Sequence, residues 1–392
     1  MTPRGAPEEL QGPRPAAVVL AAGASSRMGY FKPLLDLGGQ SPLARVVGLF
    51  QDHGVEPVLV VTGHRAGELA PVVRELGGEP VFNPDHRQGM FASLRAGLAA
   101  LPPGAPAFFL LPVDIPLVRG HTLIRLLQAW SPGREQALLP TFGGQPGHPP
   151  LIAAGLAPAI AAYAGPGGLR GFWQANPGLV KEVPVADRFI LRDLDRPEDH
   201  QRMLRDLPGR RVPDSSECLA LLRGVLGRDS ELVAHCRAVG AVALALARGV
   251  NAAGGSLDER LALAGGLLHD VAKGSPDHAA AGAALLREMG FPAVAPLAGL
   301  HLDMEVAGQA PLSEAELVHL ADKLVLGAGR VGLEERYAAR LDSLGERPEV
   351  RAAILRRRAT ARRIAARVER ALGCGLEECL AGLDLSGGEG RG

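Results

Sequence analysis

The sequence feature that most constrains the fold is an alternation of short apolar runs and longer amphipathic segments over roughly the first half of the chain. The runs "AAVVLAAG", "EPVLVVTG", "GEPVFN" and "AFFLLPVD" each predict a strand that ends in glycine, asparagine or aspartate. Segments such as "SPLARVVGLFQDHG" and "GMFASLRAGLAALP" lie between them and have the apolar spacing of helices. This alternation predicts βαβ units and a mostly parallel sheet, with ligands at the carboxyl ends of the strands.

The composition changes after about residue 200. Of the chain's 15 aromatic residues only Phe291 and Tyr337 follow that point, and the second half is rich in alanine, leucine, arginine and glutamate. Such a segment with few β-branched runs predicts an almost entirely helical region. A length of 392 residues with 47% hydrophobic residues suits two or three globular domains.

The two halves give a domain plan. We expect a flexible N-terminus over 1–14, an α/β domain with a Rossmann-like, mostly parallel sheet over 15–205, and a linker over 206–217. An all-α domain over 218–384 and a disordered tail over 385–392 follow. The linker, "DLPGRRVPDSSE", ends in serines that we expect to cap a helix.

Charge and cysteine usage narrow the classes of partner. The formal net charge is +0, so no global basic field indicates nucleic acid. The first residues are too polar for a signal peptide, and no uncharged apolar stretch reaches the roughly 18 residues of a membrane span. The four cysteines form no CxxC pair, which suits reduced thiols. We therefore expect a cytoplasmic protein that binds neither nucleic acid nor membrane.

The stretch "LAAGASSRMGYFKPLL", residues 20–35, follows the first predicted strand. A glycine-rich turn there exposes backbone N–H groups to an anion, and Arg27 adds a forked cation. The spacing matches neither GxxxxGK[ST] nor GxGxxG, and an ordinary glycine-rich turn stays the alternative. Lys32 is one of only four lysines in the chain, which suggests a task that arginine does not perform.

This stretch resembles the LAAGxSxRMGxxK signature of MobA-like nucleotidyltransferases, and most closely that of the molybdenum cofactor cytidylyltransferases. Four further segments resemble that branch in order: "NPDHRQGMFASLRAGL" (83–98), "LPVDIP" (111–116), "GQPGHPP" (144–150) and "DLDRPEDH" (193–200). The resemblance implies transfer of CMP from CTP to molybdopterin, with release of pyrophosphate. Molybdoenzyme maturation proteins are candidate further partners.

The same resemblance implies the residues of the site. Arg27, Lys32 and Asp114 would be catalytic, and Asp114 and Asp195 would hold Mg²⁺, which prefers carboxylates and phosphate oxygens. The implied nucleotide-binding residues are Leu20, Ala21, Ala22, Gly23, Ser25, Arg27, Lys32, Gly89, Ser93 and Asp114.

Departures from the family pattern leave alternatives open. "GPGGLR" (165–170) stands where the family often has GDxGAR, and Arg196 stands where it has threonine. Both changes bear on the acceptor, so a sugar or polyol phosphate is the alternative to molybdopterin. Asp195 is equally well a helix N-cap, with Asp193 as the rival ligand. For His148 we expect a part in shaping its loop.

The second half carries a set of histidines and aspartates: His235, His269, Asp270, His278, His301 and Asp322. Imidazole and carboxylate are ligands for Fe, Mn or Zn. The adjacent His269 and Asp270 end an apolar helix, where burial without a shared cation is costly. Taken singly, a histidine on an apolar helix is more often a packed core residue, and Asp322 is as readily a pairing carboxylate.

The order H…HD…H…H…D resembles the HD superfamily of metal-dependent phosphohydrolases, whose fold is all-helical. By this resemblance His235, His269, Asp270 and Asp322 match the basic ligand set, and His278 and His301 match the ligands of a second metal. The implied activity is hydrolysis of a nucleotide or another phosphate ester with one or two ions of Fe, Mn or Zn. A non-catalytic nucleotide sensor and an oligomerisation module are the alternatives.

Overall fold

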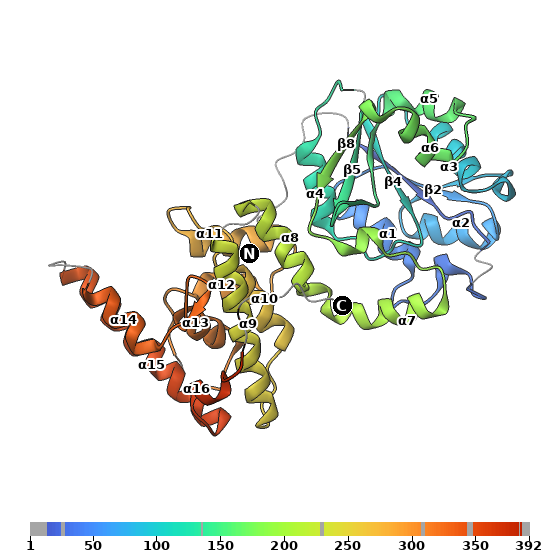
Figure 1. Cartoon of the computed structure of the whole chain (residues 1–392). Coiled ribbons are helices and arrows are strands. Elements are labelled where there is room, and N and C mark those ends of the chain that lie inside the picture. The colour runs from blue at the N-terminus through green and yellow to red at the C-terminus, as the bar shows by residue number, and fades with distance from the viewer. Residues whose placement is uncertain are drawn as a thin grey trace, which may run out of the picture. The chain divides into compact units, whose positions relative to one another are not determined.

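The computed structural model describes residues 14–24, 28–134, 136–227, 231–306, 310–342, 348–383 and 385. The chain divides into two compact units, Met1–Pro208 and Gly209–Gly392 (Figure 1). This division falls inside the expected linker 206–217. The expected flexible N-terminus lies outside the described residues except for Arg14, and the expected disordered tail does so except for Leu385.

The first unit is a mixed, mostly parallel sheet with helices, as the alternating sequence predicts. The described strands pair in the order β3-β2-β1-β4-β7-β5-β6, and β8 pairs with β5. The strands are β1 Ala16–Leu20, β2 Val58–Thr62, β3 Glu79–Phe82, β4 Ala107–Pro112, β5 Ala137–Phe142, β6 Gln145–Pro146, β7 Leu151–Ala153 and β8 Val180–Pro184. The helices are α1 Pro42–Gln51, α2 Ala66–Glu75, α3 Met90–Ala99, α4 Gly120–Ala129, α5 Ala157–Ala162, α6 Gly168–Ala175 and α7 Pro197–Asp206.

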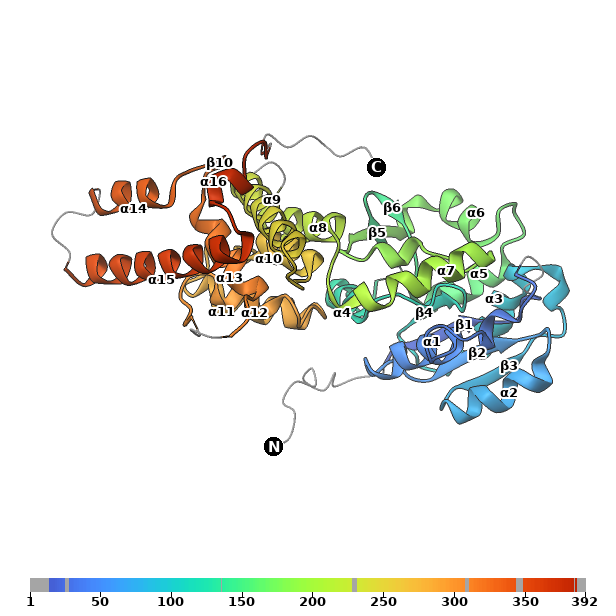
Figure 2. The same ribbon diagram turned by 90° about the horizontal axis from the view of Figure 1, so that it is seen from below.

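Alternation along β1 explains why helices cover both faces of the sheet. All five β1 residues are buried, and successive side chains point to opposite faces. Ala17 and Val19 belong to a core with side chains of α1, α2 and α4. Val18 belongs to a second core with side chains of α3, α5 and α6 (Figure 1, Figure 2). A strand buried on both faces suits the centre of a parallel sheet.

The pairing of β1 with β4 places two important loops side by side. The two strands run parallel with Leu20 opposite Pro112, so their carboxyl ends meet at one edge. The Val113 N–H donates to the Leu20 carbonyl at 3.0 Å. The Leu194 N–H donates to the Asp114 carbonyl at 2.8 Å, which brings the segment before α7 to the same edge.

The second unit is helical apart from one short two-stranded ladder among its described residues, β9 Val325–Leu326 and β10 Gly329–Arg330. Its helices are α8 Ser215–Leu226, α9 Glu231–Ala252, α10 Glu259–Leu268, α11 His278–Glu288, α12 Ala295–Leu300, α13 Glu314–Lys323, α14 Leu333–Asp342, α15 Pro348–Leu372 and α16 Leu376–Cys379. The prediction of an all-helical second region is confirmed.

The expected serine cap of the linker is wrong. Asp214 is the N-cap of α8, and its Oδ1 accepts a hydrogen bond from the Glu217 N–H at 2.9 Å. Glu217 Oε2 in turn accepts from the Asp214 N–H at 3.0 Å. This reciprocal capping box satisfies two N–H groups that a serine at the first helical position leaves unpaired.

Helix α9 is the central helix of the second unit. Its apolar residues form one core with side chains of α10, α13, α15 and α16. Among the described residues it is also the one helix whose length and composition would suit a membrane span, and 56% of its most apolar stretch is buried inside the protein. It also carries the charged residues Glu231, Arg237 and Arg248.

Candidate active sites

The first candidate site centres on Lys32 at the sheet edge where β1 and β4 end. Lys32 lies in a short 3-10 turn, Lys32–Leu34, and its Nζ donates to Asp195 Oδ1 at 2.6 Å. The same Nζ lies 3.7 Å from Asp114 Oδ2. The structure therefore brings together three predicted site residues that are far apart in the sequence.

The carboxylates around Lys32 suit a divalent cation. Burial raises the pKa of Asp114, Lys32 lowers it, and the carboxylates of Asp195 and Asp193 raise it further. Three carboxylates with one ammonium group leave an excess of negative charge at a partly buried position. Mg²⁺ is commonly held by one or two carboxylates together with substrate phosphates, so this donor set fits that ion.

The two alternatives for Asp195 are now distinguishable. The N-cap position of α7 is Arg196, and Asp199 Oδ2 accepts from the Arg196 N–H at 2.9 Å and from the Asp195 N–H at 3.2 Å. Asp199 thus supplies the capping carboxylate, and the Asp195 side chain reaches Lys32 instead. Asp193 is exposed but close enough to Asp114 to affect its pKa.

A cavity of about 260 Å³ adjoins this cluster. Its lining includes every described residue of the predicted nucleotide set, namely Leu20, Ala21, Ala22, Gly23, Lys32, Gly89, Ser93 and Asp114. Ser93 is buried and accepts a hydrogen bond from Asn83 Nδ2 at 3.1 Å. The predicted residues Ser25 and Arg27 lie outside the described residues. Their assignment stays a prediction.

A second cavity of about 950 Å³ shares Leu20, Met90 and Pro112 with the first. The segment "GPGGLR", which bears on the acceptor, lines it through residues 167–170, and the loop "GQPGHPP" lines it through residues 146–148. Arg196, the other departure that bears on the acceptor, is not among the described lining residues of either cavity. His148 Nδ1 lies 3.4 Å from the Leu110 carbonyl, and burial lowers the pKa of its ring. A neutral ring held against a carbonyl suits the expected loop-shaping role.

Sequence reasoning missed the aromatic wall of this second cavity. Phe91 and Trp173 line it together with the exposed Met90. Phe91 is one of the two letters of "GMFASL" that the family pattern GMxxSL leaves variable. Trp173 lies in α6 with no motif around it, so neither position carried a recognisable signal.

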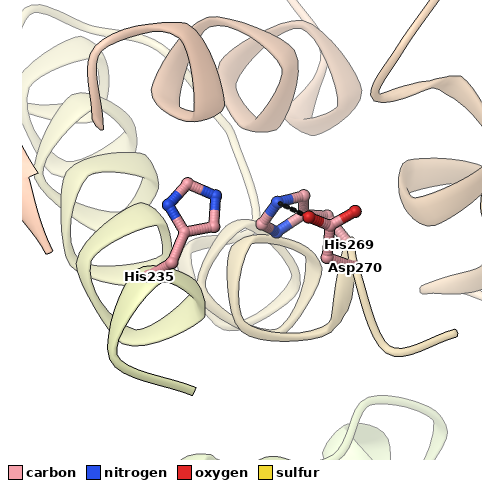
Figure 3. A group of neighbouring side chains, drawn as sticks. All are labelled: His235, His269 and Asp270. Atoms are coloured by element: carbon pink, nitrogen blue, oxygen red, sulfur yellow. Dashed lines mark ion pairs between the residues drawn. The ribbon is translucent and has the colours of Figure 1, made fainter. Parts of the chain in front are cut away.

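The second candidate site collects all six predicted ligands in the second unit. His235 comes from α9, His269 and Asp270 follow α10, and His278 begins α11. His301 follows α12, and Asp322 lies in α13. Figure 3 shows the rings of His235 and His269 and the Asp270 carboxylate gathered between these helices. The ends of short helices thus supply most of the cluster.

Five of the six residues form two overlapping groups, and Asp322 lies beside the first of them. His235, His269 and Asp270 have ligand atoms within 4.8 Å of one another, and so do Asp270, His278 and His301. Asp322 Oδ1 lies 3.3 Å from His235 Nε2 and 3.8 Å from His269 Nε2. Asp270 therefore belongs to both groups and offers one oxygen to each.

Hydrogen bonds on the outer side of the cluster fix the histidine tautomers. The Nδ1 atoms of His235, His269 and His301 lie 3.0, 2.8 and 2.6 Å from the backbone carbonyls of Gly327, Gly266 and Ala298. Because a carbonyl only accepts, each Nδ1 carries the proton and each Nε2 presents a lone pair to the cluster. This is the arrangement that metal-binding histidines commonly adopt.

The inner atoms of the cluster are buried and unpaired. Within the described part of the chain, the Nε2 atoms of His269, His278 and His301 and Oδ1 of Asp270 have no hydrogen-bond partner. Yet Asp270 Oδ1 lies 3.2 Å from His278 Nε2 and 3.3 Å from His301 Nε2. Because the His301 proton lies on Nδ1, its Nε2 and Asp270 Oδ1 are two acceptors that face each other, and this arrangement requires a shared cation. The residues fit one or two transition-metal ions.

The pKa shifts agree with a neutral-imidazole, ionised-carboxylate ligand set. Burial lowers the pKa of His269 to about 4. Burial alone would raise the pKa of Asp322, but the positive charges of Lys323 and Arg336 hold it well below its usual range. Metals bind imidazole and carboxylate in these deprotonated forms.

A basic cleft of about 410 Å³ surrounds the cluster. Its cationic lining residues are Lys273, Lys323, Arg336, Arg340 and Arg357. Lys273 Nζ lies 2.8 Å from Asp270 Oδ2, so this lysine pairs with a member of the cluster. The sequence did not single out the three arginines, because α14 and α15 are rich in arginine throughout. His319 is buried in α13 and belongs to neither ligand group.

Comparison with known proteins supports this division into two sites. Residues 17–180 match the family described as MobA-like NTP transferase domain, and residues 232–326 match the HD domain family. Nicotine blue oxidoreductase of Paenarthrobacter nicotinovorans is 32% identical over 48% of this chain and 95% of its own. Molybdenum cofactor cytidylyltransferase of Escherichia coli is 28% identical over 46% of this chain and 91% of its own. A solved nucleotidyl transferase of Methanothermobacter is 24% identical over 50% of this chain and 99% of its own, with a TM-score of 0.45.

Proposed function

The chain belongs to the MobA-like NTP transferase family in its first half and to the HD domain family in its second, and we propose that it is an enzyme with two activities. The first unit transfers CMP from CTP to a molybdopterin-type acceptor. The second hydrolyses a phosphate ester or anhydride in a metal-dependent reaction. The observation that carries the first proposal is the position of Lys32, Asp114 and Asp195. Lys32 lies close to both carboxylates and lines the smaller cavity together with Asp114, and the larger cavity adjoins the smaller one.

In the proposed transfer the terminal phosphate of the acceptor attacks the α-phosphorus of CTP. A new P–O bond forms, the bond to the β-phosphate breaks, and pyrophosphate leaves. Lys32 is placed to neutralise charge on the reacting phosphate, and the cavity lined by Gly23 and Ser93 holds the nucleotide. Mg²⁺ bound to Asp114 and Asp195 would add charge neutralisation. The cavity of about 950 Å³ has room for a large acceptor beside it.

The base and the acceptor are tested together. The purified chain is incubated with each of the four NTPs and molybdopterin, and pyrophosphate release is followed. Selective release with CTP supports the proposal. Release that needs a sugar or polyol phosphate instead of molybdopterin favours the alternative acceptor class.

The relative named nicotine blue oxidoreductase makes a redox activity a second candidate for the first unit. The NTP screen separates the two, because a redox enzyme consumes no NTP and releases no pyrophosphate. A lysine that lies close to two carboxylates and lines a cavity of about 260 Å³ favours nucleotidyl transfer.

For the second unit, the observation that carries the proposal is the set of facing, unpaired acceptors at Asp270, His278 and His301. A metal bound there would lower the pKa of a water molecule and polarise a phosphate. The chain's own contribution is the geometry of the ligands and the cations of the cleft, which hold the anionic substrate. Metal analysis and a phosphatase screen of the whole protein test this. Absence of bound Fe, Mn or Zn together with absence of phosphate release would favour the nucleotide sensor.

A further inference from the structure

The basic cleft of the second unit adjoins a small recess of about 40 Å³. Five residues line both, namely Leu302, Lys323, Arg336, Arg340 and Arg357. The recess adds only Tyr337 and Ile354 to that set. The recess is therefore continuous with the metal cleft. Arg336 lines both, and its Nη2 lies 3.7 Å from Asp322 Oδ1 of the cluster.

The Tyr337 hydroxyl is unpaired in this recess. The side chain is 4% exposed, and within the described residues its Oη has no hydrogen-bond partner. Burial raises the pKa of Tyr337 to about 12, so the hydroxyl keeps its proton and remains a donor. Packing alone does not require this oxygen, because a phenylalanine would fill the same space without leaving a buried polar group unsatisfied.

The charges around the recess have one sign. Four lysine or arginine side chains line it. Lys323 comes from α13, Arg357 from α15, and both Arg336 and Arg340 from α14. Among the described residues, no carboxylate lines the recess. Lys323 pairs with Asp322 and Arg357 with Asp303, two carboxylates outside the recess lining, and Arg336 Nη2 lies 3.7 Å from Asp322. The recess lining thus combines these cationic side chains with the O–H donor of Tyr337. A phosphoryl group, with oxygens that only accept, complements such a set.

We propose that the recess binds a second phosphoryl group of the substrate, so that the metal cleft acts on compounds with two phosphoryl groups, such as nucleoside diphosphates or bisphosphates. This rests on the proposed phosphohydrolase activity. One phosphoryl group lies at the His–Asp cluster, where water supplies the oxygen of the new P–O bond. The P–O bond to the leaving group breaks, and the leaving oxygen takes up the proton. The other phosphoryl group lies against Tyr337 and Arg340.

The kinetic test compares substrates that differ in phosphoryl number. AMP carries one group, whereas ADP and adenosine 3′,5′-bisphosphate carry two in different arrangements and so distinguish the anhydride from the bisphosphate. Tyr337→Phe is expected to lower the ratio of kcat/KM for the preferred two-phosphoryl substrate over kcat/KM for AMP about tenfold. Arg340→Gln lowers it in the same direction. Arg351→Gln removes an exposed arginine of α15 that lines neither cavity and should leave the ratio unchanged. An unchanged ratio in Tyr337→Phe overturns the inference.

A binding test keeps the recess separable from the hydrolase proposal. Inorganic pyrophosphate is titrated calorimetrically into the metal-free full chain, in a Lys32→Met background that suppresses binding at the transferase site. Adding Tyr337→Phe should weaken binding about tenfold. If no assay detects hydrolysis but Tyr337→Phe still weakens pyrophosphate binding, the hydrolase proposal fails and the anion-binding recess stands. Equal pyrophosphate binding together with a higher Tm for Tyr337→Phe shows a merely structural tyrosine and overturns the inference.

Discussion

At the scale of single residues, Lys32 links the sequence pattern to the proposed chemistry of the first unit. Its ammonium group lies 2.6 Å from one carboxylate and 3.7 Å from another at the mouth of the nucleotide-sized cavity. A compact ammonium fits between two carboxylates and a phosphate, whereas a planar guanidinium has a fixed fork of donors.

Lys32→Met is therefore expected to lower kcat of the transfer about 100-fold, or roughly 2.7 kcal/mol of transition-state stabilisation. Lys32→Arg restores little of that activity, because its donors are placed differently. Steady-state pyrophosphate release measures both variants, with Lys181→Met, a lysine on β8 outside both cavity linings, as the control. Full activity in Lys32→Arg would contradict this role.

Two buried histidines give the metal-free second unit a defined pH dependence. Burial lowers the pKa of both His269 and His319 to about 4, from 6.5. The unfolded chain therefore binds a proton at each ring before the folded chain does. Stability is full above pH 6.5 and falls as the pH falls toward 4, by about 3 kcal/mol for each histidine.

Denaturant unfolding of the chelated protein between pH 7 and 4 measures that decline. His319→Leu removes its own contribution and should make the decline shallower, while His269 and His278, whose pKa values burial also lowers, keep the remainder. The Lys181→Met variant serves as a matched control with the wild-type decline. A variant curve parallel to the wild-type curve would show that His319 does not titrate in this way.

At the scale of elements, the sequence predicted most of what positions the two sites. Period-two and period-3.6 patterns depend on local burial, and for this reason β1, β2, β3, β4, α1 and α3 appear where the sequence indicates them. The cap of α8 was misplaced because serine and aspartate are comparable N-caps, and only the reciprocal bond to Glu217 selects Asp214. The sequence did not predict the basic lining of the metal cleft. Helix α15 has many arginines, and only tertiary contacts determine which of them line the cleft.

The arginines of α15 illustrate that point. Figure 2 shows α14 and α15 side by side, and Arg358 and Arg362 both pair with Glu334 of α14. Arg357 pairs with Asp303, and Arg367 pairs with the buried Glu316. Several positive charges of this helix thus pair with carboxylates of the same unit.

The capping box of α8 predicts a measurable stability effect. Asp214→Ala removes the side-chain acceptor for the Glu217 N–H, whereas the backbone N–H of residue 214 still donates to the Glu217 carboxylate. We expect a loss of about 1–2 kcal/mol of unfolding free energy in the second unit. Asp214→Asn keeps an acceptor and should lose less. Chemical denaturation followed by far-UV circular dichroism measures both, and equal losses in the two variants would contradict the capping role.

At the scale of the whole molecule, the two units have separate cores and separate candidate metal sites. Ligands that bind only the folded state raise its stability, so each unit should respond to its own ligand. In calorimetric scans, Mn²⁺ or Zn²⁺ should raise the Tm of a transition that His269→Asn makes unresponsive. CTP with Mg²⁺ should raise the Tm of the other, and Lys32→Met should abolish that response. One transition that responds to both ligands would contradict independent sites.

The proposed transferase activity is the central claim, and the screen of the four NTPs with molybdopterin tests it most directly. We expect pyrophosphate release with CTP that depends on the acceptor, is at least tenfold faster than with GTP, ATP or UTP, and is lost in Lys32→Met. The claim would be contradicted if none of the four NTPs gave pyrophosphate release in the presence of active molybdopterin. Equal release by the wild type and Lys32→Met would also contradict it.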